Sequence, residues 1–193
     1  MAWSKAGSTT LTSAGDTITI SSMTASNFYT ALSHNYGTGG TVYNSNRINA
    51  NSGSNYAWRR SINGGTDSTF ASQAQIAHDS GNINSSTSFC VGYLVGIETE
   101  EKLAIFFEVG QSTAGAGNAP NRVEAVGKYA DTSNTIDQLS DYNVGAGNYD
   151  TGSNISALGS DGVESMTVQD GAVYYETDTN KEYVLYDNTW TEL

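Results

Sequence analysis

The sequence has one cysteine, one proline and few basic residues, and each shortage excludes something. One thiol cannot form a disulfide within the chain, so no disulfide framework supports the fold. Eight lysines and arginines against 20 aspartates and glutamates give a formal net charge of −12 at pH 7. Nucleic-acid backbones and anionic membrane surfaces would repel such a chain, which argues against both as partners. No apolar run approaches the roughly 18 residues of a membrane-spanning helix.

The abundant residues are small and polar. Ser, Thr, Asn and Gly make up 85 of the 193 residues, and only 15% of the chain is charged. These residue types weaken helix interiors and favour turns, which excludes a helical bundle or a coiled coil. Hydrophobic residues still amount to 37%, enough for a packed core once glycine is counted. We therefore expect a globular all-β fold with short strands and many turns.

Two neighbouring apolar runs, 87–98 and 102–110, give the clearest strand signals. Only the acidic letters ETEE separate their apolar parts, so the two strands are predicted to form a hairpin whose tip lies in water. Both runs are continuously apolar, which predicts burial on both faces or in the centre of a sandwich. Further strands are predicted at 16–21, 27–34, 41–49, 54–61, 122–130 and 135–142. For 27–34, a short helix is the alternative.

Turn signals between these segments recur at a spacing of roughly 8 to 12 residues, as in a β-sandwich or jelly roll. We expect a jelly-roll-like β-sandwich over residues 1–160. Residues 161–193 are expected to form a small acidic, aromatic-rich β-meander, since an Asp-Gly pair at 170–171 is a hairpin signal. A meander of about 30 residues is near the lower limit of independent stability, so it should pack on the main domain or on a neighbouring subunit.

The chain offers little for catalysis or metal binding. Cys90 has apolar neighbours and is expected in the core, where Trp3 and Trp58 should anchor the sandwich. His34 and His78 are expected on the surface or in turns, because a zinc site would need further ligands at suitable spacing. The carboxylates at the predicted hairpin tip are expected to be solvated and not to act as a glycosidase pair; they are Glu98, Glu100 and Glu101. We expect no catalytic residue, no metal and no cofactor.

A cluster of aromatic residues in the predicted meander is the candidate binding site. It comprises Tyr174, Tyr175, Tyr183, Tyr186 and Trp190. Strand alternation puts Tyr174 and Tyr175 on opposite faces, so some rings must face outward or meet a partner. Three interpretations remain open: the rings form the core of the meander, they form a protein interface, or they contact a glycan.

Four stretches of the sequence resemble structural proteins of marine phages and together span about residues 2–162. They read AWSKAGSTTLTSAGDTITISSMTAS, SGSNYAWRRSINGGTDS, VGIETEEKLAIFFEVGQSTAGAGNAPNRVEAVGKYADTSNTI and GAGNYDTGSNISALGSDG. The C-terminal stretch DGAVYYETDTNKEYVLYDNTW resembles a short Tyr/Trp-rich module at the ends of phage tail and head-fibre proteins. The resemblance implies a component of the phage particle, and it transfers no catalytic or binding residue.

These expectations combine into one functional prediction. The N-terminal letters MAWSKAGSTT contain no hydrophobic signal-peptide core, although the composition is that of an exposed surface protein. A virion protein, made in the host cytoplasm and exposed on the phage particle, reconciles the two. We expect a non-enzymatic capsid decoration or head-fibre subunit that binds other virion proteins and copies of itself. The alternative is a tail-fibre receptor-binding module that recognises host surface glycans, and a third hypothesis is a polysaccharide depolymerase.

Overall fold

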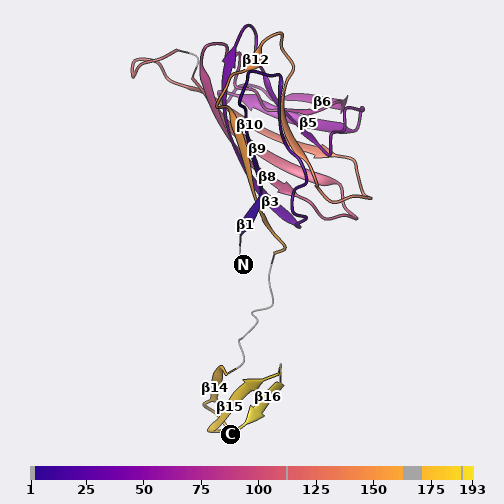
Figure 1. Ribbon diagram of the computed structural model, residues 1–193, viewed down its shortest axis with the longest axis vertical. Helices are drawn as coiled ribbons and strands as arrows, with labels where there is room; N and C mark the ends of the chain where they lie inside the picture. Colours follow the sequence, from indigo (N-terminus) through magenta and orange to yellow (C-terminus); the bar gives the residue numbers. More distant parts are fainter. Residues whose placement is uncertain (1–2, 112, 163–170, 188) are drawn as a thin grey trace. The chain divides into compact units, whose positions relative to one another are not determined.

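Every regular element in the described part of the chain is a β-strand, which confirms the predicted all-β class (Figure 1). The computed structural model describes residues 3–111, 113–162, 171–187 and 189–193. The chain divides into two compact units, 2–162 and 163–193, slightly beyond the predicted boundary at residue 160. Within the described residues, no helix has the length and hydropathy needed to cross a membrane. The two units are described separately below.

The first unit contains a large sheet of nine antiparallel strands in the order β1-β13-β3-β8-β9-β10-β5-β6, with the short β12 alongside β3. Its strands are β1 (Ser4–Thr10), β3 (Phe28–Thr38), β5 (Tyr56–Ile62), β6 (Ser68–Gln73), β8 (Thr87–Val95), β9 (Lys102–Gly110), β10 (Asn121–Tyr129), β12 (Asn148–Tyr149) and β13 (Asn154–Ser160). Figure 1 shows β3, β8, β9 and β10 side by side in the body of this sheet.

A second sheet packs on one face of the large sheet, and the core lies between them. It has the order β2-β11-β4-β7, with β2 (Thr17–Ile20), β11 (Leu139–Asn143), β4 (Asn44–Ile48) and β7 (Ile76–Ala77). Both sheets contribute fully buried apolar side chains to one cluster, among them Ile18, Ile48, Ile76, Leu139, Phe106, Val123 and Ile155. We call the covered side of the large sheet its inner face and the opposite side its outer face. The arrangement is a β-sandwich.

The strand pairing has a simple order once two hairpins are set aside. Without the hairpins β5–β6 and β9–β10 and the short β12, eight strands remain, namely β1, β2, β3, β4, β7, β8, β11 and β13. The first of these pairs with the eighth, the second with the seventh, the third with the sixth and the fourth with the fifth. The two hairpins widen the large sheet beyond β8.

The predicted hairpin over 87–110 is confirmed. Of the two predicted kinds of burial, burial on both faces is wrong, and a place in the sandwich core is confirmed for the inward side chains. β8 and β9 are antiparallel neighbours, with Tyr93 opposite Ile105. The side chains of both strands alternate between buried and exposed, so only the inner face is covered. The other predicted strand segments all contain strands, and 27–34 is a strand and not a helix. Five strands of the first unit were not predicted: the edge strands β1 and β6 of the large sheet, its strand β13, and the short β7 and β12.

The two tryptophans of the first unit behave differently. Trp58 is 8% exposed and stacks on Phe70, as expected of a residue that anchors the sandwich. Trp3 is 43% exposed, so the expectation that it anchors the core is wrong. It precedes the edge strand β1, where little of the sheet remains to cover its ring.

The second unit contains a three-stranded antiparallel meander, as predicted. Its strands are β14 (Val173–Glu176), β15 (Lys181–Tyr186) and β16 (Thr189–Glu192). Asn180 has a positive φ of 55° in the turn between β14 and β15, a conformation that asparagine tolerates better than most residues. The expected Asp-Gly hairpin signal lies partly outside the described residues.

Candidate functional site

The outer face of the large sheet is apolar along its central strand β9. Four side chains of β9 turn inward and are buried, namely Lys102, Ala104, Phe106 and Glu108. The outward side chains between them are 40–54% exposed, and they are Leu103, Ile105, Phe107 and Val109. Water therefore contacts four consecutive outward positions that carry no polar side-chain atom.

The register of the sheet brings further apolar side chains beside this row. Ile105 lies opposite Tyr93 of β8 on one side and opposite Val126 of β10 on the other. Val109 lies opposite Phe89 of β8. We define the apolar face as the exposed side chains of β3, β8, β9 and β10 on this side, which are Phe28, Leu32, Phe89, Tyr93, Leu103, Ile105, Phe107, Val109 and Val126.

The apolar face is larger than a typical monomer exposes. Its nine side chains are each 39–54% exposed. With about 150–250 Å² for a large side chain, the exposed area is on the order of 700 Å². The largest apolar patch on a soluble monomer is about 300–600 Å² and often functional, whereas one partner of a standard protein interface contributes about 800 Å². The area therefore indicates an interaction surface.

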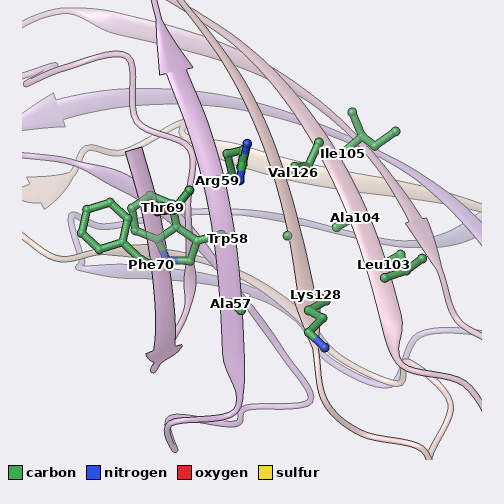
Figure 2. A pocket seen from close by; sticks show the side chains of 11 residues that line it. Ala57, Trp58, Arg59, Thr69, Phe70, Leu103, Ala104, Ile105, Val126 and Lys128 are labelled. Carbon is green, nitrogen blue, oxygen red and sulfur yellow. The ribbon is translucent and has the colours of Figure 1, made fainter. Parts of the chain in front are cut away.

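The apolar face is hollowed and not flat. A hollow of about 530 Å³ opens between β5, β9 and β10. Figure 2 shows Leu103 and Ile105 of β9 and Val126 of β10 among the side chains that line it, together with Ala57 and Arg59 of β5. Two further hollows, of about 420 Å³ and 350 Å³, extend along the same face past Phe107. Such relief offers sites into which side chains of a partner can insert.

The charges around the apolar face balance one another. Three ion pairs lie on the outer side of β5 and β10, namely Arg59–Asp67 at 3.3 Å, Arg122–Glu124 at 3.5 Å and Lys128–Glu101 at 2.7 Å. All six side chains are exposed to solvent. Exposed pairs of this kind contribute little to stability. Together these six side chains carry no net charge, whereas the whole chain has a net charge of −12.

A buried polar cluster holds β9 from the inner side. Both oxygens of the Glu108 carboxylate accept hydrogen bonds from the small-sheet side of the core. Oε1 accepts from Ser80, from its backbone N at 2.9 Å and its Oγ at 2.7 Å. Oε2 accepts from His78 Nδ1 at 2.8 Å and from Asn44 Nδ2 at 3.0 Å. Four donors fill the acceptor positions of a carboxylate, so its charge is stabilised inside the core.

His78 carries the compensating charge. The side chain is fully buried, so its predicted place on the surface is wrong. Burial alone would lower the pKa of His78, but the Glu108 carboxylate, hydrogen-bonded to His78 Nδ1 at 2.8 Å, helps to hold that pKa well above its usual value. Burial raises the pKa of the Cys90 thiol, so it stays protonated in the core, where it was expected.

Asp141 forms the second carboxylate centre between the sheets. It belongs to β11 and accepts hydrogen bonds from Asn46 Nδ2 at 2.6 Å and from Asn35 Nδ2 at 2.8 Å. Burial raises the pKa of Asp141, and the nearby His78 and the amide donors offset part of that rise. Asn35 lies in the large sheet and Asn46 in the small one, so the hydrogen bonds of Asp141 tie the two layers together.

We call Glu108 and its donors Asn44, His78 and Ser80 the clamp, because their hydrogen bonds hold β9 to the small-sheet side of the core. The ligand atoms of His78, Cys90 and Glu108 lie within 4.8 Å of one another, a spacing that a metal ion could use. A zinc site needs a thiolate and a free carboxylate lone pair. Here the Glu108 oxygens already accept four hydrogen bonds, which leaves no free carboxylate lone pair for a metal ion. We therefore assign the cluster a structural role.

Lys102 anchors the other end of β9. Its ammonium group is buried and lies within hydrogen-bond distance of four backbone carbonyls, which share its three N–H donors: those of Ile97 (2.7 Å), Glu98 (3.1 Å), Glu100 (2.6 Å) and Asp131 (2.9 Å). The lysine thereby fixes the tip of the β8–β9 hairpin. The tip carboxylates Glu98 and Glu100 are exposed, as predicted. Between Lys102 and Glu108, the backbone of β9 is held from the inside.

The aromatic residues of the second unit do not form one site. Tyr174, Tyr183 and Trp190 lie on one side of the meander, with Tyr174 tilted against Tyr183 and edge-on to Trp190. These three rings and Glu176 line a hollow of about 360 Å³. Strand alternation puts Tyr175 and Tyr186 on the opposite side, where they are 49% and 72% exposed. The candidate site therefore reduces to the first three rings.

No family model, curated protein or solved structure matches this chain. The functional argument consequently rests on the two surfaces, the apolar face of the first unit and the aromatic hollow of the second.

Proposed function

We propose that the protein is a non-enzymatic structural subunit of a phage particle, displayed on the particle surface as a capsid decoration or head-fibre protein. The apolar face carries this proposal, because its area is that of one partner in a standard protein interface. The stretches that resemble phage structural proteins supply the biological setting. The cluster of His78, Cys90 and Glu108 is sealed in the core and hydrogen-bonded, which supports a structural and not a catalytic role.

The order of strand pairing supports the jelly-roll interpretation of the sandwich. A jelly roll pairs its first strand with the eighth, the second with the seventh, the third with the sixth and the fourth with the fifth. The eight strands left after the two hairpins are set aside follow this order. Jelly rolls are widespread in viral capsid and lectin domains. In this interpretation the added hairpin β9–β10 builds most of the apolar face on a common scaffold.

The proposed mechanism is repeated contact on a symmetric particle. Each copy would cover its apolar face against neighbouring subunits and present its remaining, acidic surface to water. Many copies on a lattice gain avidity, so individual contacts with the shell need not be strong. The partners are other virion proteins of the capsid or tail and copies of the same chain.

Mass spectrometry of purified particles tests the proposal. Particles of the phage that encodes the chain should contain it in many copies, and a mild salt wash should leave it attached. A matched sample of unassembled lysate, fractionated in the same gradient, controls for co-sedimentation. If the chain is abundant in the lysate and missing from the particles, the proposed function is wrong.

The aromatic hollow of the second unit favours one alternative, a tail-fibre module that recognises host glycans. Rings with a nearby carboxylate, here Glu176, are a common way to hold a sugar. A glycan array separates the two functions if it compares the full chain with Trp190→Ala and Tyr186→Ala. Tyr186 is an exposed aromatic residue on the other side of the same meander, so it is a matched control. Binding that only Trp190→Ala abolishes would support glycan recognition.

A further inference from the structure

We propose that the apolar face is covered by the same face of another copy of this chain, so that the protein works as a homo-oligomer. The inference deepens the proposed assembly role, on which it rests, because it names the partner of that face. Three observations favour a copy of the chain over a different protein: the area, the balance of charge and the relief of the surface.

The exposed area is sufficient for a contact between two copies. One face offers on the order of 700 Å², and two faces pressed together would bury nearly twice that, which is within the range of standard specific interfaces. Sheets that pack face to face lie about 10 Å apart and interdigitate the side chains of their facing sides. The row on β9 and its neighbours on β8 are branched and aromatic residues, the types that fill such a space in a sandwich core.

The charge around the face suits a contact between identical chains. The chain as a whole carries −12, so two copies repel each other over most of their surface. On the β5 and β10 side of the apolar face, however, three cationic and three anionic side chains are already paired. At these six side chains, two copies would therefore meet no unpaired charge. A strongly basic partner would instead be attracted to the acidic surface elsewhere.

The apolar face has both projecting side chains and hollows, so two copies of it can fit one another. Large rings project from one part of it, at Phe89, Tyr93 and Phe107. A hollow of about 530 Å³ lies on the other side of the β9 row, beside Ala57, Arg59 and Val126 (Figure 2). In a two-fold contact, the projecting part of one copy meets the hollow part of the other, and the reverse contact follows by symmetry.

Light scattering coupled to size exclusion tests this inference on the purified full chain. The wild type should have a mass of at least twice that of one chain, which is 20.4 kDa. Ile105→Lys should shift the mass to that of the monomer, because an unpaired ammonium group in an apolar interface should raise the dissociation constant by about 100-fold or more. A wild type that remains monomeric at high micromolar concentration overturns the inference.

A matched pair of valines controls for surface hydrophobicity in general. Val126 lies in the apolar face and is 48% exposed, whereas Val144 follows β11 of the small sheet and is 45% exposed. Val126→Lys should weaken the oligomer, and Val144→Lys should leave it unchanged. The reverse pattern, or equal effects, contradicts the assignment of this face. Circular dichroism and melting curves confirm that each variant is folded.

Maleimide labelling of introduced cysteines tests the same contact without placing a lysine in it. Cys90 is buried, so a new surface cysteine is the reactive one. Ile105→Cys should react slowly with a bulky maleimide and faster on dilution, while Val144→Cys should react quickly at every concentration. Equal rates for the two cysteines overturn the inference. If the purified chain is a monomer but is found on particles, only this inference is wrong. If it is an oligomer but is missing from particles, only the proposed function is wrong.

Discussion

Phe107 and Glu108 are neighbours in β9, and their side chains occupy opposite faces of the large sheet. Glu108 is buried and accepts four hydrogen bonds. Phe107 is 49% exposed at the centre of the apolar face. The backbone of β9 therefore links a buried polar clamp to an apolar contact surface. Lys102 fixes the same strand at its other end, so the outward row Leu103 to Val109 is presented by a rigid element.

The clamp at Glu108 should be a major contributor to stability. Glu108→Ala leaves His78 with an uncompensated charge and leaves the donors of Ser80 and Asn44 without their acceptor. We expect a loss of about 3–5 kcal/mol in the free energy of unfolding, measured by urea denaturation. Glu108→Gln should lose less, because its amide oxygen still accepts. Glu124→Ala, an exposed carboxylate on β10, should change stability by less than about 0.5 kcal/mol. Equal losses for Glu108→Ala and Glu124→Ala would contradict the clamp.

The pKa of His78 makes a specific prediction about pH. Because the hydrogen-bonded Glu108 carboxylate helps to raise this pKa despite burial, the folded protein binds the His78 proton more tightly than the unfolded chain does. The resulting stability is complete below pH about 6.5, the unfolded value, and is lost as pH rises through the folded pKa. The difference in unfolding free energy between wild type and His78→Gln should therefore be larger at pH 6 than at pH 9–10, two conditions for urea titrations. A difference that does not change with pH would show that His78 is neutral in the fold.

Lys102 should hold the hairpin tip in place. Lys102→Met keeps the length of the side chain but removes the donors for four carbonyls, including those of Ile97 and Asp131. Buried carbonyls without donors cost about 1–3 kcal/mol, which should appear as a lower melting temperature. Hydrogen exchange should also rise at the 97–101 turn. Lys128→Met, which removes an exposed ion pair, is the matched control and should have little effect. Similar effects of the two variants would refute the role of Lys102.

The packing of β10 on the small sheet should depend on Gly127. A Cβ atom at this position would come within 2.8 Å of Ile76 side-chain atoms. Gly127→Ala should therefore destabilise the fold by about 1–3 kcal/mol, as overpacking of a core does. The double variant with Ile76→Ala should lose less than the sum of the two single changes, since removing the isoleucine atoms relieves the clash. Simple additivity in chemical denaturation would contradict this contact.

The strands could be predicted because their signals are local. The hairpin over 87–110 was visible from two apolar runs and an acidic tip, and both its pairing and the solvated tip are confirmed. The unpredicted strands β1 and β13 are rich in Ser, Gly and Thr, which resemble loop residues. Their pairing with each other spans most of the first unit, so no local signal reveals it.

The exposure of the outer face could not be predicted from polarity alone. In β9 the outward side chains are all apolar, whereas the charged Lys102 and Glu108 point inward, so polarity does not mark the exposed face. The size of the side chains does carry a signal, because inward positions such as Cys90, Gly92 and Ala104 are small and outward ones such as Tyr93 are large. The reason is that the Phe106 ring packs over Gly92, where a Cβ atom would come within 2.7 Å of it.

The buried clamp was missed because its partners are far apart in the sequence. His78 and Glu108 are separated by 30 residues and approach from opposite layers of the sandwich. Glu108 lies in an apolar run that signals burial, but nothing near it in the sequence identifies His78 as its partner, and His78 itself resembles a surface residue. For the aromatic residues, alternation correctly separated Tyr174 from Tyr175, but only the meander itself shows that Trp190 joins Tyr174 and Tyr183.

Immunogold labelling of intact particles tests the central claim most directly. An antibody raised against the first unit, applied to intact particles of the phage that encodes the chain and viewed by electron microscopy, should place gold over the head in many copies. Preincubation of the antibody with the purified chain should abolish the labelling. Gold confined to the tail tip would replace decoration with receptor recognition, and unlabelled particles would contradict display on the particle altogether.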